Sequence, residues 1–144
     1  MTAGNATRPP RRLGRSIGAV FAGLLAIVIL STATDAVLHS TGVFAPPGEP
    51  MANSLWLLAT AYRIVFGVVG CCIAARLAPN RPMRHALVLG SIGVVVSLAG
   101  FLATRGKGPG FGPTWYPLGL VATALPSAWV GGKLHAMRAT KHVT

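Results

Sequence analysis

The sequence predicts an all-α, polytopic membrane protein with four transmembrane helices in an antiparallel up-down bundle. The first observation is composition, because 52% of the 144 residues are hydrophobic and only 10% are charged, against about 25% charged residues in a soluble domain. The second is a set of four apolar stretches, each close to the roughly 20 residues that cross a bilayer core of about 30 Å. They lie at residues 17–38, 55–75, 86–103 and 115–134.

This composition also excludes several classes of protein. The apolar content is too high for a disordered chain, two cysteines cannot form a disulfide framework, and the length is too small for a two-domain enzyme. The stretches lack the alternating polar residues of a membrane barrel strand, which leaves helices. The chain therefore divides into a cytoplasmic basic tail (1–16), a transmembrane domain (17–134) and a second cytoplasmic basic tail (135–144).

The first stretch, residues 17–38, contains one charged residue, Asp35. A secretory signal peptide is an alternative for this region, because arginines precede the apolar run and the small residues Ser31, Thr32 and Ala33 follow it. The apolar pattern resumes as far as Leu38, which favours a full span over a cleaved leader.

The other three stretches carry the residues expected at membrane boundaries. In the second, Trp56 lies near the start and Asn53 is a candidate helix cap. The third has no charge and follows Pro82, which is tolerated at the start of a helix. The fourth opens with Trp115 and Tyr116, as expected for aromatic side chains at head-group level.

Helices in lipid associate through small residues that let their backbones approach closely. The fourth stretch offers such a stripe at four-residue spacing. We expect its members to form a helix-packing face, and they are Gly119, Thr123, Ser127 and Gly131.

The basic residues predict the orientation, because cytoplasmic loops retain the excess of lysine and arginine. Only Arg105 and Lys107 lie between the third and fourth stretches, whereas ten basic residues fall on the opposite side. Both termini are therefore expected in the cytoplasm, where the basic residues would attract anionic lipid head groups. No aromatic interleaving suggests a nucleic-acid partner. The ten residues are Arg8, Arg11, Arg12, Arg15, Arg76, Arg81, Arg84, Lys133, Arg138 and Lys141.

Apart from Lys133 near the end of the fourth stretch, two charged residues lie within the predicted spans, where such residues are energetically unfavourable and pair with a partner. Asp35 is about one turn from the outer end of the first span, and Arg63 lies in the outer half of the second. We expect these two residues to meet between adjacent antiparallel helices. His39 follows Asp35 by four residues and Tyr62 precedes Arg63, so all four form a candidate intramembrane polar cluster.

Several functions compete for this cluster. The leading interpretation is an ion pair that fixes helix register in a non-enzymatic structural or accessory bundle. The alternative is the substrate or proton site of a small oligomeric transporter or channel. No catalytic residue, cofactor or metal is expected, because no nucleophile and base, and no set of metal ligands, stand at a recognised spacing. A homo-oligomer or another membrane protein is an expected partner.

Several short segments resemble those of a family of small, uncharacterised bacterial four-span membrane proteins. This resemblance implies a bacterial plasma (inner) membrane and supplies no activity. Small four-span multidrug exporters are an analogy, but they place their acidic residue in mid-membrane, unlike Asp35. The segments are Thr34-Asp35, Leu38-His39, 42–44, Pro50-Met51, 57–63 (LLATAYR), 75–79 (ARLAP), 81–87 (RPMRHAL), 111–117 (FGPTWYP) and 131–134 (GGKL).

Overall fold

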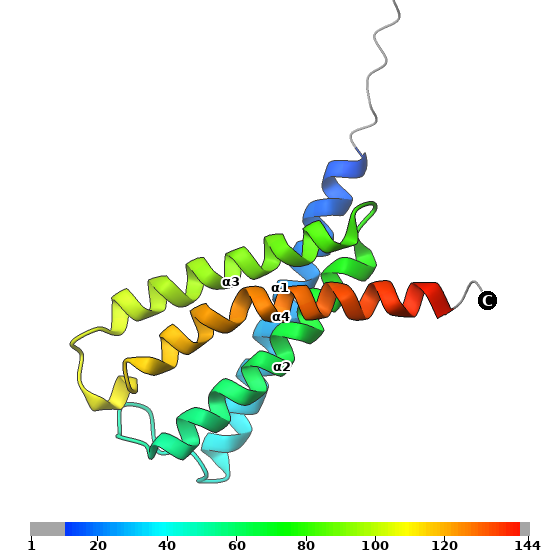
Figure 1. Ribbon diagram of the computed structural model, residues 1–144. Helices are drawn as coiled ribbons and strands as arrows, with labels where there is room; N and C mark the ends of the chain where they lie inside the picture. Colours follow the sequence, from blue (N-terminus) through cyan, green and yellow to red (C-terminus); the bar gives the residue numbers. More distant parts are fainter. Residues whose placement is uncertain (1–10, 142–144) are drawn as a thin grey trace, which may run out of the picture.

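The computed structural model describes residues 11–141 and is all-α, as the sequence predicts. The helices are α1 (Arg11–Ser40), α2 (Asn53–Leu77), α3 (Pro82–Thr104) and α4 (Trp115–Lys141). A short 3-10 helix, η1 (Pro109–Phe111), lies in the α3–α4 connection (Figure 1). No strand occurs within residues 11–141.

Three of these helices are long and apolar enough to cross a membrane. They are α1 (over Leu13–Ser40), α2 and α3, and fewer than a quarter of the residues in the apolar stretch of each are buried. Large apolar side chains such as Ile17, Leu102 and Val95 are more than half exposed, as expected for surfaces that contact lipid. Four spans were predicted, and α4 does not meet the same criterion of apolar content.

The helix boundaries differ from the predicted stretches at their ends. α1 continues without interruption through Ser31–Ala33 as far as Ser40. The cap of α2 is Ala52, which makes no side-chain hydrogen bond, so the expectation that Asn53 caps this helix was wrong. Asn53 is instead the first helical residue. Pro82 begins α3, as predicted, directly after Arg81 in a left-handed backbone conformation.

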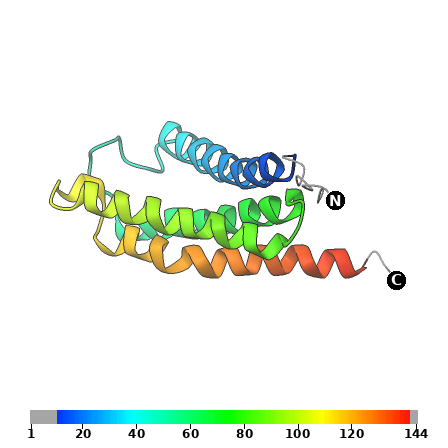
Figure 2. The same cartoon turned by 90° about the horizontal axis from the view of Figure 1, so that it is seen from above.

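Successive helices alternate in direction, but they do not form a simple ring (Figures 1 and 2). α2 contacts all three other helices and packs most extensively on α1 and α4. α3 packs most extensively on α4. α1 packs mainly on α2 and only lightly on α3. Figure 2 shows α1 on one side of the molecule and α4 on the other. The side of α1 that faces α3 is therefore left partly open.

Close approach of backbones holds the helix pairs together. A Cβ atom added to Gly23 of α1 would lie 2.5 Å from the carbonyl oxygen of Gly70 in α2. One added to Gly70 would lie 2.6 Å from the carbonyl oxygen of Gly23. In the second pair, a Cβ on Gly90 of α3 would lie 2.5 Å from the Cβ of Ala128 in α4. No larger side chain fits at these crossings without moving a helix.

Only part of the predicted stripe on α4 packs against a neighbour. Ser127 is buried against Gly67 of α2, and a Cβ on Gly131 would lie 2.6 Å from the carbonyl oxygen of Val68. Gly119 has open space where a side chain would lie, and the Thr123 hydroxyl donates to the Gly119 carbonyl within α4. The expectation of packing at Gly119 was wrong. Each four-residue step rotates about 40° around a helix, so Gly119 lies about 120° from Gly131.

Candidate functional site

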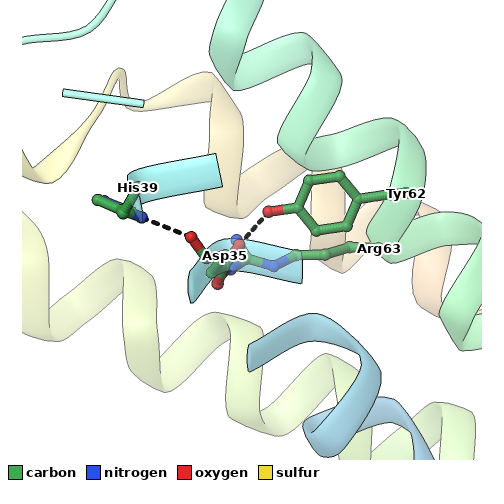
Figure 3. Close-up of polar contacts among 4 residues, drawn as sticks. All are labelled: Asp35, His39, Tyr62 and Arg63. Carbon is green, nitrogen blue, oxygen red and sulfur yellow. Dashed lines mark hydrogen bonds and ion pairs between the residues drawn. The ribbon is translucent and has the colours of Figure 1, made fainter. Parts of the chain in front are cut away.

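The polar cluster forms where the second half of α1 faces the first half of α2 (Figure 3). Tyr62 and Arg63 are consecutive on α2, and Asp35 lies opposite them on α1. The Tyr62 hydroxyl donates a hydrogen bond to Oδ1 of Asp35, and Nη2 of Arg63 donates to Oδ2. Both carboxylate oxygens are therefore engaged by side chains of the neighbouring helix.

The Asp35–Arg63 contact is the one ion pair among the side chains of residues 13–140. The two side chains remain 29% and 27% exposed, respectively, so the pair lies at the edge of the helix interface. A bonded pair of opposite charge is far less unfavourable in a low-dielectric setting than either charge alone. Each residue thus neutralises the other where the helices meet.

The guanidinium group of Arg63 also lies near two tyrosine rings. Its Cζ is 5.7 Å from the ring centre of Tyr62 and 5.6 Å from that of Tyr116, which belongs to α4. Such distances permit attraction between the cation and the faces of the rings. Tyr116 connects α4 to the cluster, a role that sequence reasoning missed because it treated this tyrosine only as a membrane-boundary residue.

Aromatic side chains pack next to the polar cluster. Tyr116 is buried against Phe44 and Ala59, and its ring centre is 4.8 Å from that of Trp56. The Tyr116 hydroxyl is buried and has no hydrogen-bond partner within the described part of the chain. Packing of its ring, and not hydrogen bonding of its hydroxyl, therefore holds Tyr116 in place.

His39 joins the cluster only through the backbone. Its Nδ1 lies 2.8 Å from the carbonyl oxygen of Asp35, one helical turn earlier (Figure 3). Its ring meets the Phe44 ring edge-on, with 5.5 Å between the ring centres. The expected four-residue cluster is therefore a contact of three side chains. Among the described residues, the His39 ring forms no direct hydrogen bond with the Asp35 carboxylate.

A cavity of about 340 Å³ extends from this pair between the helices. Asp35 and Arg63 lie among its lining residues, together with apolar side chains from all four helices. Hydroxyl groups supply its remaining polar lining, and these belong to Ser31, Thr32, Ser97, Thr123 and Ser127. Such a lining can contact a small polar or amphipathic molecule, and each oxygen of its one carboxylate, that of Asp35, already accepts a hydrogen bond.

The described residues give little support for metal binding or for cysteine chemistry. Among them, no group of three or more His, Cys, Asp or Glu side chains is placed to hold a metal ion. Cys71 and Cys72 are free, and Cys71 is buried at the contact of α2 with α4. The arrangement around Asp35 can hold two helices in one register.

Comparison with known proteins gave no match: no family model, no curated protein and no solved structure is similar to this chain. The function is therefore argued from the site and the fold.

Proposed function

We propose that the chain is a four-span integral protein of a bacterial plasma membrane, with a non-enzymatic structural or accessory role. The observation that carries the functional part is that both carboxylate oxygens of Asp35 are bonded to side chains of α2. A carboxylate held in this way is suited to positioning helices and poorly suited to carrying protons or substrate. The resemblance to small bacterial four-span proteins agrees with this proposal.

Helix α4 is proposed as the fourth span in spite of its lower apolar content. No charged residue occurs from Trp115 to Gly132. Its small residues, among them Ser127, Ala128 and Gly131, lower its hydropathy and lie buried against α2 and α3, away from lipid. Trp115 lies at its start, and Lys133 Nζ lies 5.3 Å from the Trp129 ring centre near the other end. Eighteen residue steps separate Trp115 from Lys133, about 27 Å of helix, which is close to the roughly 30 Å of a bilayer core.

Both termini are proposed to lie in the cytoplasm, because the basic residues gather at one end of the fold. Arg76, Arg81 and Arg84 flank the α2–α3 connection, and Lys133 and Arg138 lie in the last turns of α4. The opposite end has Arg105 and Lys107 with the two acidic residues, Asp35 and Glu49. This asymmetry is the one that the positive-inside rule describes. We also propose that α1 is retained and not cleaved as a leader, because it supplies half of the Gly23–Gly70 crossing.

The structural role is tested by a double-mutant cycle on Asp35 and Arg63. Either alanine substitution alone leaves a charge without its partner, which is expected to lower the free energy of unfolding by about 1–3 kcal/mol. The double variant should recover about 1 kcal/mol or more of the summed loss. Titration of the purified, detergent-solubilised protein with dodecyl sulfate measures the free energy of unfolding of the wild type, the two single variants and the double variant.

The matched control is the corresponding cycle on Glu49 and Arg105, which lie at the same end and form no ion pair with each other among the described residues. Their substitutions should be additive. Additive losses at Asp35 and Arg63 as well would contradict a register-fixing pair.

A small oligomeric transporter or channel is the second candidate, because the 340 Å³ cavity reaches Asp35 and Arg63. In that case Asp35→Asn should leave a folded protein that no longer moves its substrate. Export of a fluorescent organic cation from cells that produce the wild-type chain or this variant distinguishes the two. Equal export by both chains, at the level of cells lacking the protein, would remove the transporter candidate.

A further inference from the structure

A second hollow lies at the opposite end of the molecule from the Asp35 cluster. It has a volume of about 480 Å³ and separates the first half of α1 from the start of α3. Its lining combines two kinds of residue. Arginine and histidine side chains from the α2–α3 connection and the start of α3 lie at one end, and apolar side chains of α1 and α3 form the walls.

The basic end consists of Arg81, Arg84 and His85. Arg81 and Arg84 are exposed, and neither forms an ion pair with a side chain of residues 13–140. The chain has only two acidic residues, Asp35 and Glu49, and both lie at the other end of the fold. No acidic side chain of the chain therefore balances the charges of these arginines.

The apolar walls continue directly from the basic end. Ile17 and Phe21 of α1 are 63% and 61% exposed, and Val88 of α3 is 51% exposed. The exposed apolar surface of α3 then extends from Arg84 to Val96. The twelve residue steps from Arg84 to Val96 span about 18 Å of helix, close to the roughly 15 Å depth of one leaflet's hydrocarbon.

We propose that this groove binds one anionic phospholipid, with its phosphate at Arg81 and Arg84 and an acyl chain along the walls. A phosphate forms strong charge-assisted hydrogen bonds with guanidinium groups. A free phosphate would leave the apolar walls uncovered, and a second copy of this chain would bring another basic end to the same place. The inference rests on the proposed membrane location and is independent of the role of Asp35.

The experiment is native mass spectrometry of the full chain in a neutral detergent, titrated with phosphatidylglycerol or phosphatidylcholine of identical acyl chains. We expect one phosphatidylglycerol to be retained in preference to phosphatidylcholine. Replacing Arg81 and Arg84 together by glutamine should weaken that binding about 25-fold, at about fivefold for each basic residue. The matched control replaces Arg76 and Arg138, which are exposed but outside the groove, and should change binding less than twofold.

Equal weakening by both double variants would overturn the site, because it would indicate diffuse attraction to a basic surface. Equal retention of the two lipids would overturn the choice of an anionic lipid. Displacement of the lipid by inorganic phosphate at a similar concentration would assign the arginines to a soluble anion instead.

A second variant tests the apolar walls with the arginines intact. Val88→Trp fills the groove from α3 and should reduce lipid retention at least fivefold, while Leu102→Trp, at an exposed position of α3 outside this surface, should not. Unchanged retention in Val88→Trp would contradict insertion of the acyl chain. Release of the protein from cells without detergent would contradict the membrane proposal itself, which separates the two failures.

Discussion

At the residue scale, two tyrosines contact the same arginine but differ in what their hydroxyl groups do. The Tyr62 hydroxyl is bonded to the Asp35 carboxylate, whereas the Tyr116 hydroxyl has no partner among the described residues. Both rings lie less than 6 Å from the Arg63 guanidinium. Removing each hydroxyl in turn therefore separates the hydrogen bond from the contribution of the rings.

We expect Tyr62→Phe to lower the free energy of unfolding by about 1–2 kcal/mol, because one oxygen of the Asp35 carboxylate loses its donor. Tyr116→Phe should be neutral or slightly stabilising, since it removes a buried hydroxyl that makes no bond. Unfolding in detergent measures both variants. An equal or larger loss in Tyr116→Phe would contradict the assignment.

Part of this cluster could be predicted from the sequence. Asp35 and Arg63 are charges of opposite sign in apolar stretches that are consecutive in the chain, so a contact between them could be inferred. The backbone bond of His39 could not, because helical spacing gives the face of a side chain and not its rotamer. Tyr116 was missed because its contact with Arg63 depends on how α4 packs on α2.

At the element scale, the small residues of α4 show how a stripe relates to a packing face. Gly131 lies against the backbone of α2, while Gly119, three steps of four residues earlier, faces open space. The rotation of about 40° per step turns the stripe away from its neighbour. Two adjacent members, Ser127 and Gly131, lie in the contact with α2.

Replacing glycine by alanine is therefore expected to have opposite effects on stability at positions 131 and 119. Gly131→Ala would place a Cβ 2.6 Å from the Val68 carbonyl oxygen, and such overpacking should lower the free energy of unfolding by about 1–3 kcal/mol. Gly119→Ala meets no atom and should stabilise α4 by about 0.5–1 kcal/mol through helix propensity. Thermal unfolding of the two variants in detergent provides the comparison. A loss at Gly119 as large as that at Gly131 would show that the stripe packs along its whole length.

The spacing of small residues in α1 does not by itself identify the face that crosses α2. In α1, Gly18 begins a run of small residues with Ala22 and Ala26, yet Gly18 faces open space. The backbone contact is made by Gly23, whose small neighbour at four-residue spacing is the buried Ala19. Several small-residue faces coexist on such a helix. The partner helix, which the sequence of α1 does not specify, selects among them.

At the scale of the whole molecule, α2 is the element on which the others assemble. It pairs with α1 through Gly70 and with α4 through Gly67 and Cys71, and it carries Tyr62 and Arg63. α1 is tied mainly to α2, so the gap between α1 and α3 leaves both the cavity next to Asp35 and the groove at Arg81. Composition and hydropathy predicted the helices and their alternating direction. The side-by-side placement of α2 and α4 depends on close contacts at Gly67 and Gly131 that periodicity does not rank.

The most direct test of the four-span, ends-in account is cysteine labelling from each side of intact cells. The background carries Cys71→Ala and Cys72→Ala, which keep the Cβ atoms at the α2–α4 contact. Single cysteines replace exposed residues at the end of α1 (Ser40), in the α2–α3 and α3–α4 connections (Asn80 and Lys107) and near the end of α4 (Thr140). Gly110 is avoided because a side chain there would overlap Gly48.

We expect an impermeant reagent added outside to label only the probes at positions 40 and 107, and those at 80 and 140 only after the cells are opened. Labelling at 140 together with 40 and 107 would mean that α4 does not cross the membrane. Labelling at 80 from outside would invert the orientation and contradict the account of the basic end as cytoplasmic.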